Sequence, residues 1–144
     1  MQNLFLVAAV ICFGMAAIKL YTARMTPNRQ EGRAASAAKK AGYGLLTPEE
    51  AQARLSENES VILLDVRTQE EYDGGHIPGA VCLPVEMIAA GMPFALDKDA
   101  EIMVYCQSGA RSAQAAERLA GMGYSRVFDL GGLQDWPGEL TTEE

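Results

Sequence analysis

The sequence contains few residues of the kinds that build metal centres and disulfide frameworks. Among its 144 residues there are one histidine and three cysteines, and no two cysteines are spaced as CxxC. An odd number of isolated cysteines argues against a disulfide scaffold, and the absence of a Cys/His cluster argues against a zinc site. We interpret Cys12 and Cys82 as small buried hydrophobic residues.

The body of the chain has little positive charge. Six of the twelve basic residues lie between positions 19 and 40, whereas residues 41–144 contain six basic and eighteen acidic side chains, a net charge of −12. Such an acidic body argues against binding to nucleic acid, because it would be repelled by phosphates. The length allows one ordinary domain with a short appendage.

A long uncharged run near the N-terminus is the exception to this polarity. Residues 4–18 contain no charge and no proline. Taken as a helix and extended to Tyr21, the run would be about 27 Å long, slightly short of a hydrocarbon core of about 30 Å and only just able to span it. We therefore predict a membrane anchor over residues 1–21, which contacts the membrane through residues 4–21.

Two alternatives to the anchor remain open, a cleaved signal peptide and a buried core helix. A signal peptide is disfavoured because no positive side chain precedes the run, and because the first small-x-small site, Ala35-Ser36-Ala37, comes late. The basic residues all follow the run, which predicts a single-pass protein of the cell membrane with the rest of the chain facing the cytoplasm. Residues 22–42 are interpreted as a basic linker near anionic headgroups, or as a helical extension of the anchor.

From residue 46 onward, short apolar runs alternate with helical patterns, which predicts an α/β domain around a mostly parallel sheet. The strands are expected at residues 61–66, 80–83, 102–105 and 126–130. Helical segments are expected at residues 47–55, 70–72 and 111–122, with residues 86–95 irregular or weakly helical.

Local signals mark the ends of several elements. Thr47-Pro48-Glu49-Glu50 has the capping threonine, first-turn proline and third-position glutamate of a helix start. Ile77-Pro78-Gly79-Ala80 is typical of a type II turn. Gly131-Gly132 predicts a turn into a last short helix, with Trp136 in the core.

Cys106 occupies the position with the most chemical information, between a predicted strand and a predicted helix. Open α/β sheets bind ligands at the carboxyl ends of their strands. The free amides and the dipole of a helix N-terminus stabilise negative charge, so we expect a lowered pKa and a substantial thiolate fraction for Cys106. The small side chains at residues 108–110 let amides turn inward around the sulfur, and Arg111 adds a positive charge. With thiosulfate, attack by this thiolate would release sulfite and leave a persulfide.

Three segments in the right order resemble the single-domain rhodanese family, over nearly all of residues 45–137. The first comprises Leu64-Asp65-Val66-Arg67-Thr68, Glu71-Tyr72 and Gly75-His76-Ile77-Pro78-Gly79-Ala80. The second is Val104-Tyr105-Cys106-Gln107-Ser108-Gly109-Ala110-Arg111-Ser112. The third is Leu130-Gly131-Gly132-Leu133 with Trp136.

The resemblance implies a three-layer α/β/α, rhodanese-like fold with a five-stranded parallel sheet over residues 43–140, followed by an acidic tail at residues 141–144. It implies no metal and no other cofactor. It makes Cys106 the persulfide carrier, and His76 structural rather than a general base. The residues expected to bind substrate are Gln107, Ser108, Gly109, Ala110 and Arg111. A structural brace near the active loop is expected from Asp65, Arg67 and Glu71.

The function implied by the resemblance is sulfur transfer from thiosulfate or a persulfide to a thiol or cyanide acceptor, with a protein as a further type of donor or acceptor. One alternative is a non-catalytic binding or signalling module, although such domains generally lack the cysteine. The other is a cysteine-loop phosphatase or arsenate reductase. Phosphatase loops of this fold resemble C-x5-R, whereas Cys106 and Arg111 are separated by four residues.

Overall fold

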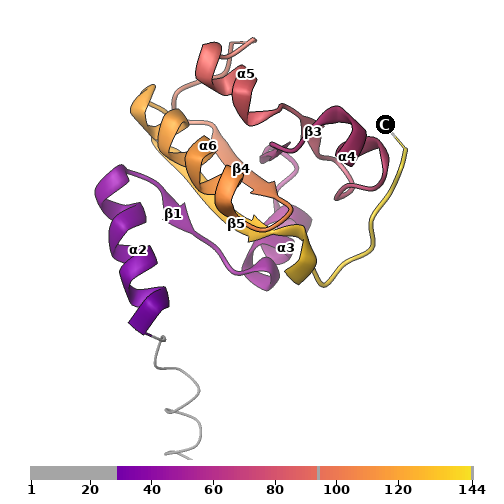
Figure 1. Cartoon of the computed structure of the whole chain (residues 1–144), viewed down its shortest axis with the longest axis horizontal. Helices are drawn as coiled ribbons and strands as arrows, with labels where there is room; N and C mark the ends of the chain where they lie inside the picture. The colour runs from indigo at the N-terminus through magenta and orange to yellow at the C-terminus, as the bar shows by residue number, and fades with distance from the viewer. Residues whose placement is uncertain (1–28, 94, 144) are drawn as a thin grey trace, which may run out of the picture. The chain divides into compact units, whose positions relative to one another are not determined.

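A five-stranded sheet forms the centre of the domain (Figure 1). The structure is a computed structural model that describes residues 29–93 and 95–143. The strands, in the spatial order β1-β5-β4-β2-β3, are β1 (Gly44–Leu45), β5 (Arg126–Gly132), β4 (Glu101–Cys106), β2 (Ile62–Asp65) and β3 (Val81–Cys82). Every neighbouring pair is parallel, which confirms the predicted α/β fold with a five-stranded parallel sheet.

The helices and the turns between them follow the local signals in the sequence. The helices are α2 (Arg29–Ala41), α3 (Pro48–Glu57), α4 (Gln69–Asp73), α5 (Val85–Ala90), α6 (Ala110–Gly121) and a short 3-10 helix, η1 (Leu133–Asp135). At the start of α3 the predicted capping box is present, because Glu50 N–H donates to Thr47 Oγ1 and Thr47 N–H donates to the Glu50 carboxylate. The predicted type II turn is confirmed by the Ala80 N–H bond to the Ile77 carbonyl and by φ 83° at Gly79.

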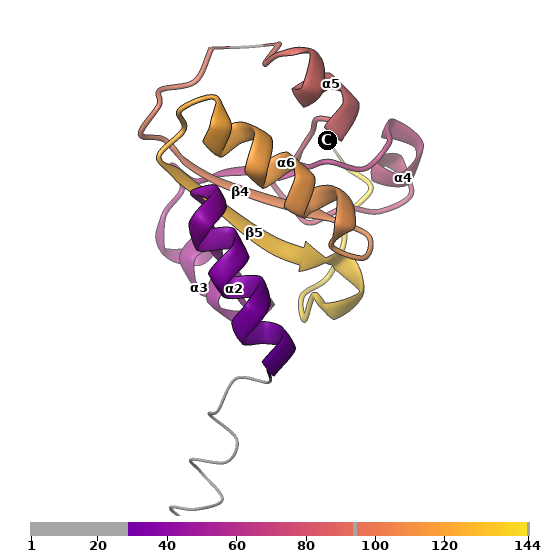
Figure 2. The same ribbon diagram turned by 60° about the vertical axis from the view of Figure 1, so that its left-hand side comes forward.

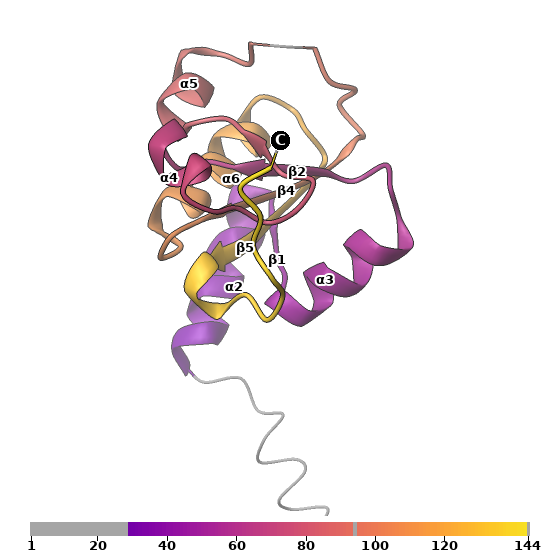
Figure 3. The same ribbon diagram turned by 90° about the vertical axis from the view of Figure 1, so that its right-hand side faces the viewer.

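Helices cover both faces of the sheet. Successive residues of a strand point to opposite faces. On β4, Val104 and Cys106 therefore pack in one cluster, with residues of α5 and α6, whereas Met103 and Tyr105 pack in the other, with residues of α3 and α4. Figure 3 shows α3 on one side of the sheet and α5 and α6 on the other, and Figure 2 shows α6 across β4 and β5. All six residues of β4 are buried, as expected for the central strand of a three-layer domain.

Two predictions near the C-terminal end of the domain are wrong. Gly131 and Gly132 do not form a turn, because both belong to β5, and η1 begins only after them. Trp136 is not within the core: it is only partly buried and packs against the cluster that contains Met103 and Tyr105, and its indole N–H is buried without a partner. A side chain of this size is seldom fully enclosed in a small domain.

The segments flanking the domain are partly described. Of the predicted linker, residues 29–41 form helix α2, which buries Ala38 to 1% exposure. The choice between a linker and an extension of the anchor depends on residues outside the described part of the chain. Thr141, in the predicted acidic tail, pairs with His76 through two main-chain hydrogen bonds of 2.9 and 2.8 Å. Among the described residues no helix has the length and apolar character needed to cross a membrane. The predicted anchor, residues 1–21, lies outside that part of the chain and stays a prediction.

A buried ion pair connects β2 to the segment after α4. The guanidinium of Arg67 donates from Nε to Asp65 Oδ1 at 2.9 Å and from Nη2 to Asp65 Oδ2 at 2.6 Å. The same Nη2 also donates to the Gly75 carbonyl at 2.7 Å. Both side chains are almost inaccessible to solvent. Arg67 therefore satisfies a carboxylate and a carbonyl that would otherwise be buried without partners.

Replacing Arg67 with methionine should lower the free energy of unfolding by about 3 to 5 kcal/mol, because it leaves the Asp65 carboxylate buried and uncompensated. Denaturant unfolding of the full chain measures the loss. The matched control is Arg126→Gln, which breaks an ion pair with Glu101 whose arginine is half exposed, and should cost at most about 1 kcal/mol. Equal losses in the two variants would contradict this account.

Candidate active site

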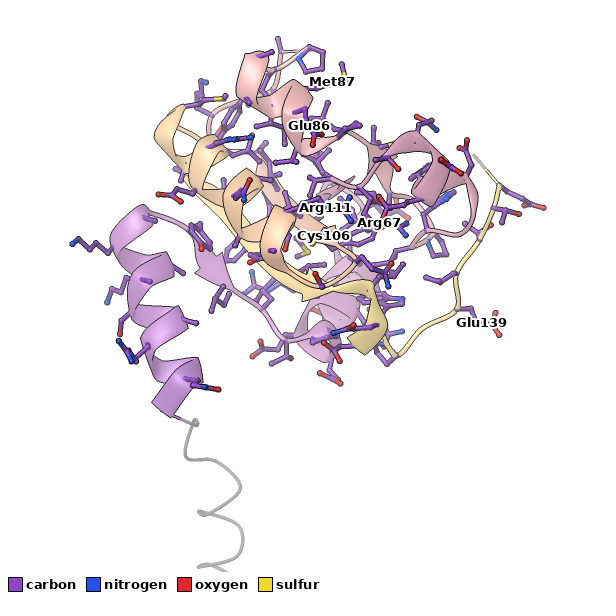
Figure 4. The ribbon with its side chains drawn as sticks, in the orientation of Figure 1. Arg67, Glu86, Met87, Cys106, Arg111 and Glu139 are labelled. Atoms are coloured by element: carbon purple, nitrogen blue, oxygen red, sulfur yellow. The ribbon has the colours of Figure 1, made fainter. Side chains whose placement is uncertain are left out.

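Cys106 is the last residue of β4, at the point where the chain leaves the sheet and enters α6 (Figure 4). Its side chain lies on the α5 and α6 face and is fully buried. Between Val104 and Cys106 the pairing with β5 shifts, so that Cys106 lies opposite Gly132. The residue is thus held by two neighbouring strands up to the start of the loop.

Hydrogen bonds from the start of α6 converge on the sulfur. Gly109 N–H donates to Cys106 Sγ at 3.0 Å. Burial raises the pKa of the thiol, but hydrogen bonds from the Ser112 amide and hydroxyl and from the amides of Gly109 and Ser108 lower it, and the net shift of the pKa is downward. The N-cap of α6 is Gly109, which has no side chain to accept these amides, so the sulfur takes that place.

Two glycines give the loop its shape. Gly109 has φ 98°, a left-handed backbone conformation that residues other than glycine rarely adopt. Gly132 lies directly against the loop, where a Cβ atom would come within 2.6 Å of the Gln107 carbonyl oxygen. Gly132 is therefore required by the close approach of β5 to the loop, whereas Gly131 is favoured by its φ of 80°.

Ser112 and Asp129 belong to the site, although neither was among the predicted site residues. The Ser112 hydroxyl contributes to the low pKa of Cys106 when its single, rotatable proton points to the sulfur, and its oxygen lies 3.0 Å from the Gly109 carbonyl oxygen. Asp129, on β5, accepts the Gly131 N–H at 2.8 Å. Burial raises the pKa of Asp129, the hydrogen bonds from Ser112 and Gly131 lower it, and the net shift of the pKa is upward. The signal that could have identified Asp129 was an acidic residue between the apolar Phe128 and Leu130 of a predicted strand.

Arg111 does not stand free beside the loop. Its Nη1 and Nη2 donate to Glu71 Oε2 at 2.7 Å and Oε1 at 2.9 Å, a bidentate pair in which both side chains are about one third exposed. Glu71 is also held by the capping box of α4, through the Thr68 N–H. The Arg111 bonds, followed by that amide bond, lower the Glu71 pKa to about 2. Of the three residues expected to form the brace, Asp65 and Arg67 pair with each other, whereas Glu71 joins the active loop.

The remaining predicted residues lie around the loop. Gln107 is exposed and lines a cavity of about 460 Å³ together with Arg67, Glu71 and Leu140. Ser108 reaches the sulfur through its amide, while its side chain and that of Ala110 are exposed.

His76 is engaged away from the loop. Its ring nitrogens lie 2.9 Å from the Tyr72 carbonyl and 3.1 Å from the Glu143 carbonyl, and the ring stacks on Tyr72. These contacts agree with a structural role. Within residues 29–93 and 95–143, no group of acidic, cysteine and histidine side chains is arranged to hold a metal.

A parallel α/β sheet with a buried cysteine under the amides of the following helix defines a class of domain with a nucleophilic cysteine loop. The family model described as Rhodanese-like domain matches residues 47–139. The chain therefore belongs to the rhodanese family.

The relatives of this chain include named sulfurtransferases. It is 44% identical over 84 residues to a sulfurtransferase of Allochromatium vinosum, covering 58% of this chain and 78% of that protein. It is 42% identical over 76 residues to the thiosulfate sulfurtransferase PspE of Escherichia coli, covering 50% of this chain and 70% of that protein. Among solved structures, a rhodanese-like domain protein from Staphylococcus aureus matches with a TM-score of 0.61 and 31% identity, covering 69% of this chain and 98% of that one. These likenesses support membership of the general sulfurtransferase class.

Replacing Ser112 with alanine should raise the pKa of Cys106, because the ionised sulfur loses its hydroxyl donor while the amides remain. One hydrogen bond of about 1 kcal/mol corresponds to about a fivefold lower thiolate fraction below the pKa. The pH dependence of Cys106 alkylation in the full chain measures the shift, with Cys106→Ser as the blank. Ser108→Ala is the control, since Ser108 contributes through its amide and should leave the midpoint unchanged. A midpoint that is the same in both variants would contradict the role given to the hydroxyl.

Proposed function

We propose that this chain is a rhodanese-type sulfurtransferase that carries sulfane sulfur as a persulfide on Cys106, taking it from thiosulfate or another persulfide and passing it to a thiol or to cyanide. The observation that carries the proposal is the geometry at Cys106: its fully buried sulfur accepts the Gly109 N–H at 3.0 Å at the start of α6, and the donors around it lower the pKa of the thiol. The thiolate is the nucleophilic form of cysteine. Hydrogen-bond donors fixed around the sulfur stabilise negative charge on the attacking thiolate and on the persulfide that replaces it.

The proposed reaction proceeds by two displacements. The Cys106 thiolate attacks the outer sulfur of thiosulfate; a new S–S bond forms on Cys106, the S–S bond of thiosulfate breaks, and sulfite leaves with the electron pair. An acceptor thiolate or cyanide then attacks the outer sulfur of the persulfide and regenerates the Cys106 thiolate. The lowered pKa of Cys106 favours the ionised nucleophile, so the proposed mechanism assigns no general base. A sulfur-carrying protein is a further type of donor or acceptor for the same loop.

The loop is poorly suited to phosphoryl transfer. Only four residues separate Cys106 from Arg111, and the Arg111 guanidinium is bound to Glu71 through both of its terminal nitrogens. Phosphoryl transfer depends on cations that contact the oxygens of the transferred group. An arginine already occupied by a carboxylate is badly placed for that task.

Incubating the full chain with thiosulfate should add one sulfur atom, detected by intact mass spectrometry. Cys106→Ser should abolish the addition, because it removes the thiol that lies among these amides, and Cys82→Ser should retain it. Thiocyanate formation from thiosulfate and cyanide should follow the same pattern, with no hydrolysis of p-nitrophenyl phosphate. A chain with intact Cys106 that gains no sulfur from thiosulfate or from a persulfide would instead favour a non-catalytic binding module.

The same proposal places the protein in the cell membrane through residues 4–21, with the catalytic domain on the cytoplasmic side. Its support is the uncharged run in the sequence and the basic residues that follow it. Deleting residues 1–21 should move the protein from the membrane fraction to the soluble fraction on cell lysis and centrifugation. A deletion variant that still sediments with membranes would reject the anchor.

A further inference from the structure

The positive charge nearest in sequence to the active loop is neutralised by a carboxylate from another element. Glu71 comes from α4 and meets Arg111 of α6 in a two-pronged ion pair. It is oriented independently of Arg111, because Thr68 N–H donates to Glu71 Oε2 at 3.0 Å and Thr68 Oγ1 lies 3.1 Å from the same oxygen. The carboxylate is thus preset to receive the guanidinium.

Arg111 lies close enough to Cys106 for the two to interact electrostatically, and Glu86 adds a further negative charge that acts on Arg111. With Glu71 in place, the loop offers the reacting sulfur its amides and the Ser112 hydroxyl, and little net positive charge. The surrounding body is acidic, with a net charge of −12 over residues 41–144. The negative electrostatic potential of the body therefore disfavours the approach of highly charged anions to the loop.

The two classes of sulfur donor differ in the charge that the site must hold. With thiosulfate, a thiolate and a dianion combine, so three negative charges share the transition state until sulfite departs. With a protonated organic persulfide, the thiolate attacks the outer sulfur of R–S–SH, the S–S bond breaks, and R–S⁻ leaves with the electron pair, so the reacting atoms carry one negative charge. A cation beside the loop consequently stabilises the first transition state more than the second.

We propose that Glu71 is a specificity-determining residue: by holding Arg111 it favours persulfide donors of low charge over thiosulfate. The inference rests on the proposed function and identifies the donor class for the same site. Among the described residues, the hydrogen bonds to the Cys106 sulfur come from the start of α6 and not from Glu71. Glu71 therefore acts through Arg111, to which it is bound. Its effect should appear in the choice between donors and not in the ability to transfer sulfur.

The test compares kcat/KM for thiosulfate and for cysteine persulfide in the full chain and in Glu71→Gln. Glutamine keeps the capping box, since it can accept the same amide, but removes the charge that holds Arg111. We expect the ratio of kcat/KM for thiosulfate to that for the persulfide to rise about fivefold, as for a partly exposed ion pair of about 1 kcal/mol. Asp73→Asn is the matched control: it removes one charge from the same helix, where Asp73 accepts from Gln69, and should leave the ratio within about twofold.

A second background separates this role from a structural one. In Arg111→Gln the replacement of Glu71 should no longer change the ratio, because there is no guanidinium to release. An unchanged ratio in Glu71→Gln, an equal rise in Asp73→Asn, or a rise that persists without Arg111 would each overturn the inference while leaving the proposed function intact. Failure of the unmodified chain to accept sulfur from either donor would overturn both.

Discussion

The site depends on one balance at the sulfur of Cys106. Burial alone would keep this thiol protonated, because a desolvated anion is costly. The amides of residues 108, 109 and 112 and the Ser112 hydroxyl reverse the shift. A carrier of sulfane sulfur needs both conditions: a dry pocket in which the persulfide is protected from side reactions, and fixed donors that stabilise negative charge before and after the transfer.

The fold supplies those donors by geometry. Strand β4 lies in the middle of the parallel sheet and ends at Cys106, and α6 starts after three intervening residues, so the free amides of its first turn face back toward the strand end. Gly109 allows the reversal through its left-handed conformation, and Gly132 lets β5 approach the loop. The buried pair of Asp65 and Arg67 fixes the end of the neighbouring strand β2, from which the chain continues to α4 and Glu71.

Much of the fold could be predicted from the sequence, because strands and helices with strong periodicity and complete caps are recognisable from their local residue pattern. The run at residues 61–66 and the capping box at Thr47 are of this kind. The residue pattern missed β1, because one of its two residues is Gly44 and glycine is disfavoured in strands. It also misassigned Gly132, because only the approach of this residue to Gln107 explains it. The pairing of Glu71 with Arg111 joins residues 40 positions apart. Such a contact is set by how α4 and α6 pack, which no local pattern contains.

The most direct measurement of the central balance is an NMR titration of the amide protons of Gly109 and Ser112 against pH in the full chain, with Cys106→Ser as the reference. If these amides bind the ionised sulfur, their resonances should move together, at a midpoint below the ordinary thiol pKa of about 8.5, and should not move in the serine variant. Resonances that titrate at or above the ordinary value, or that do not respond to Cys106 at all, would contradict the account.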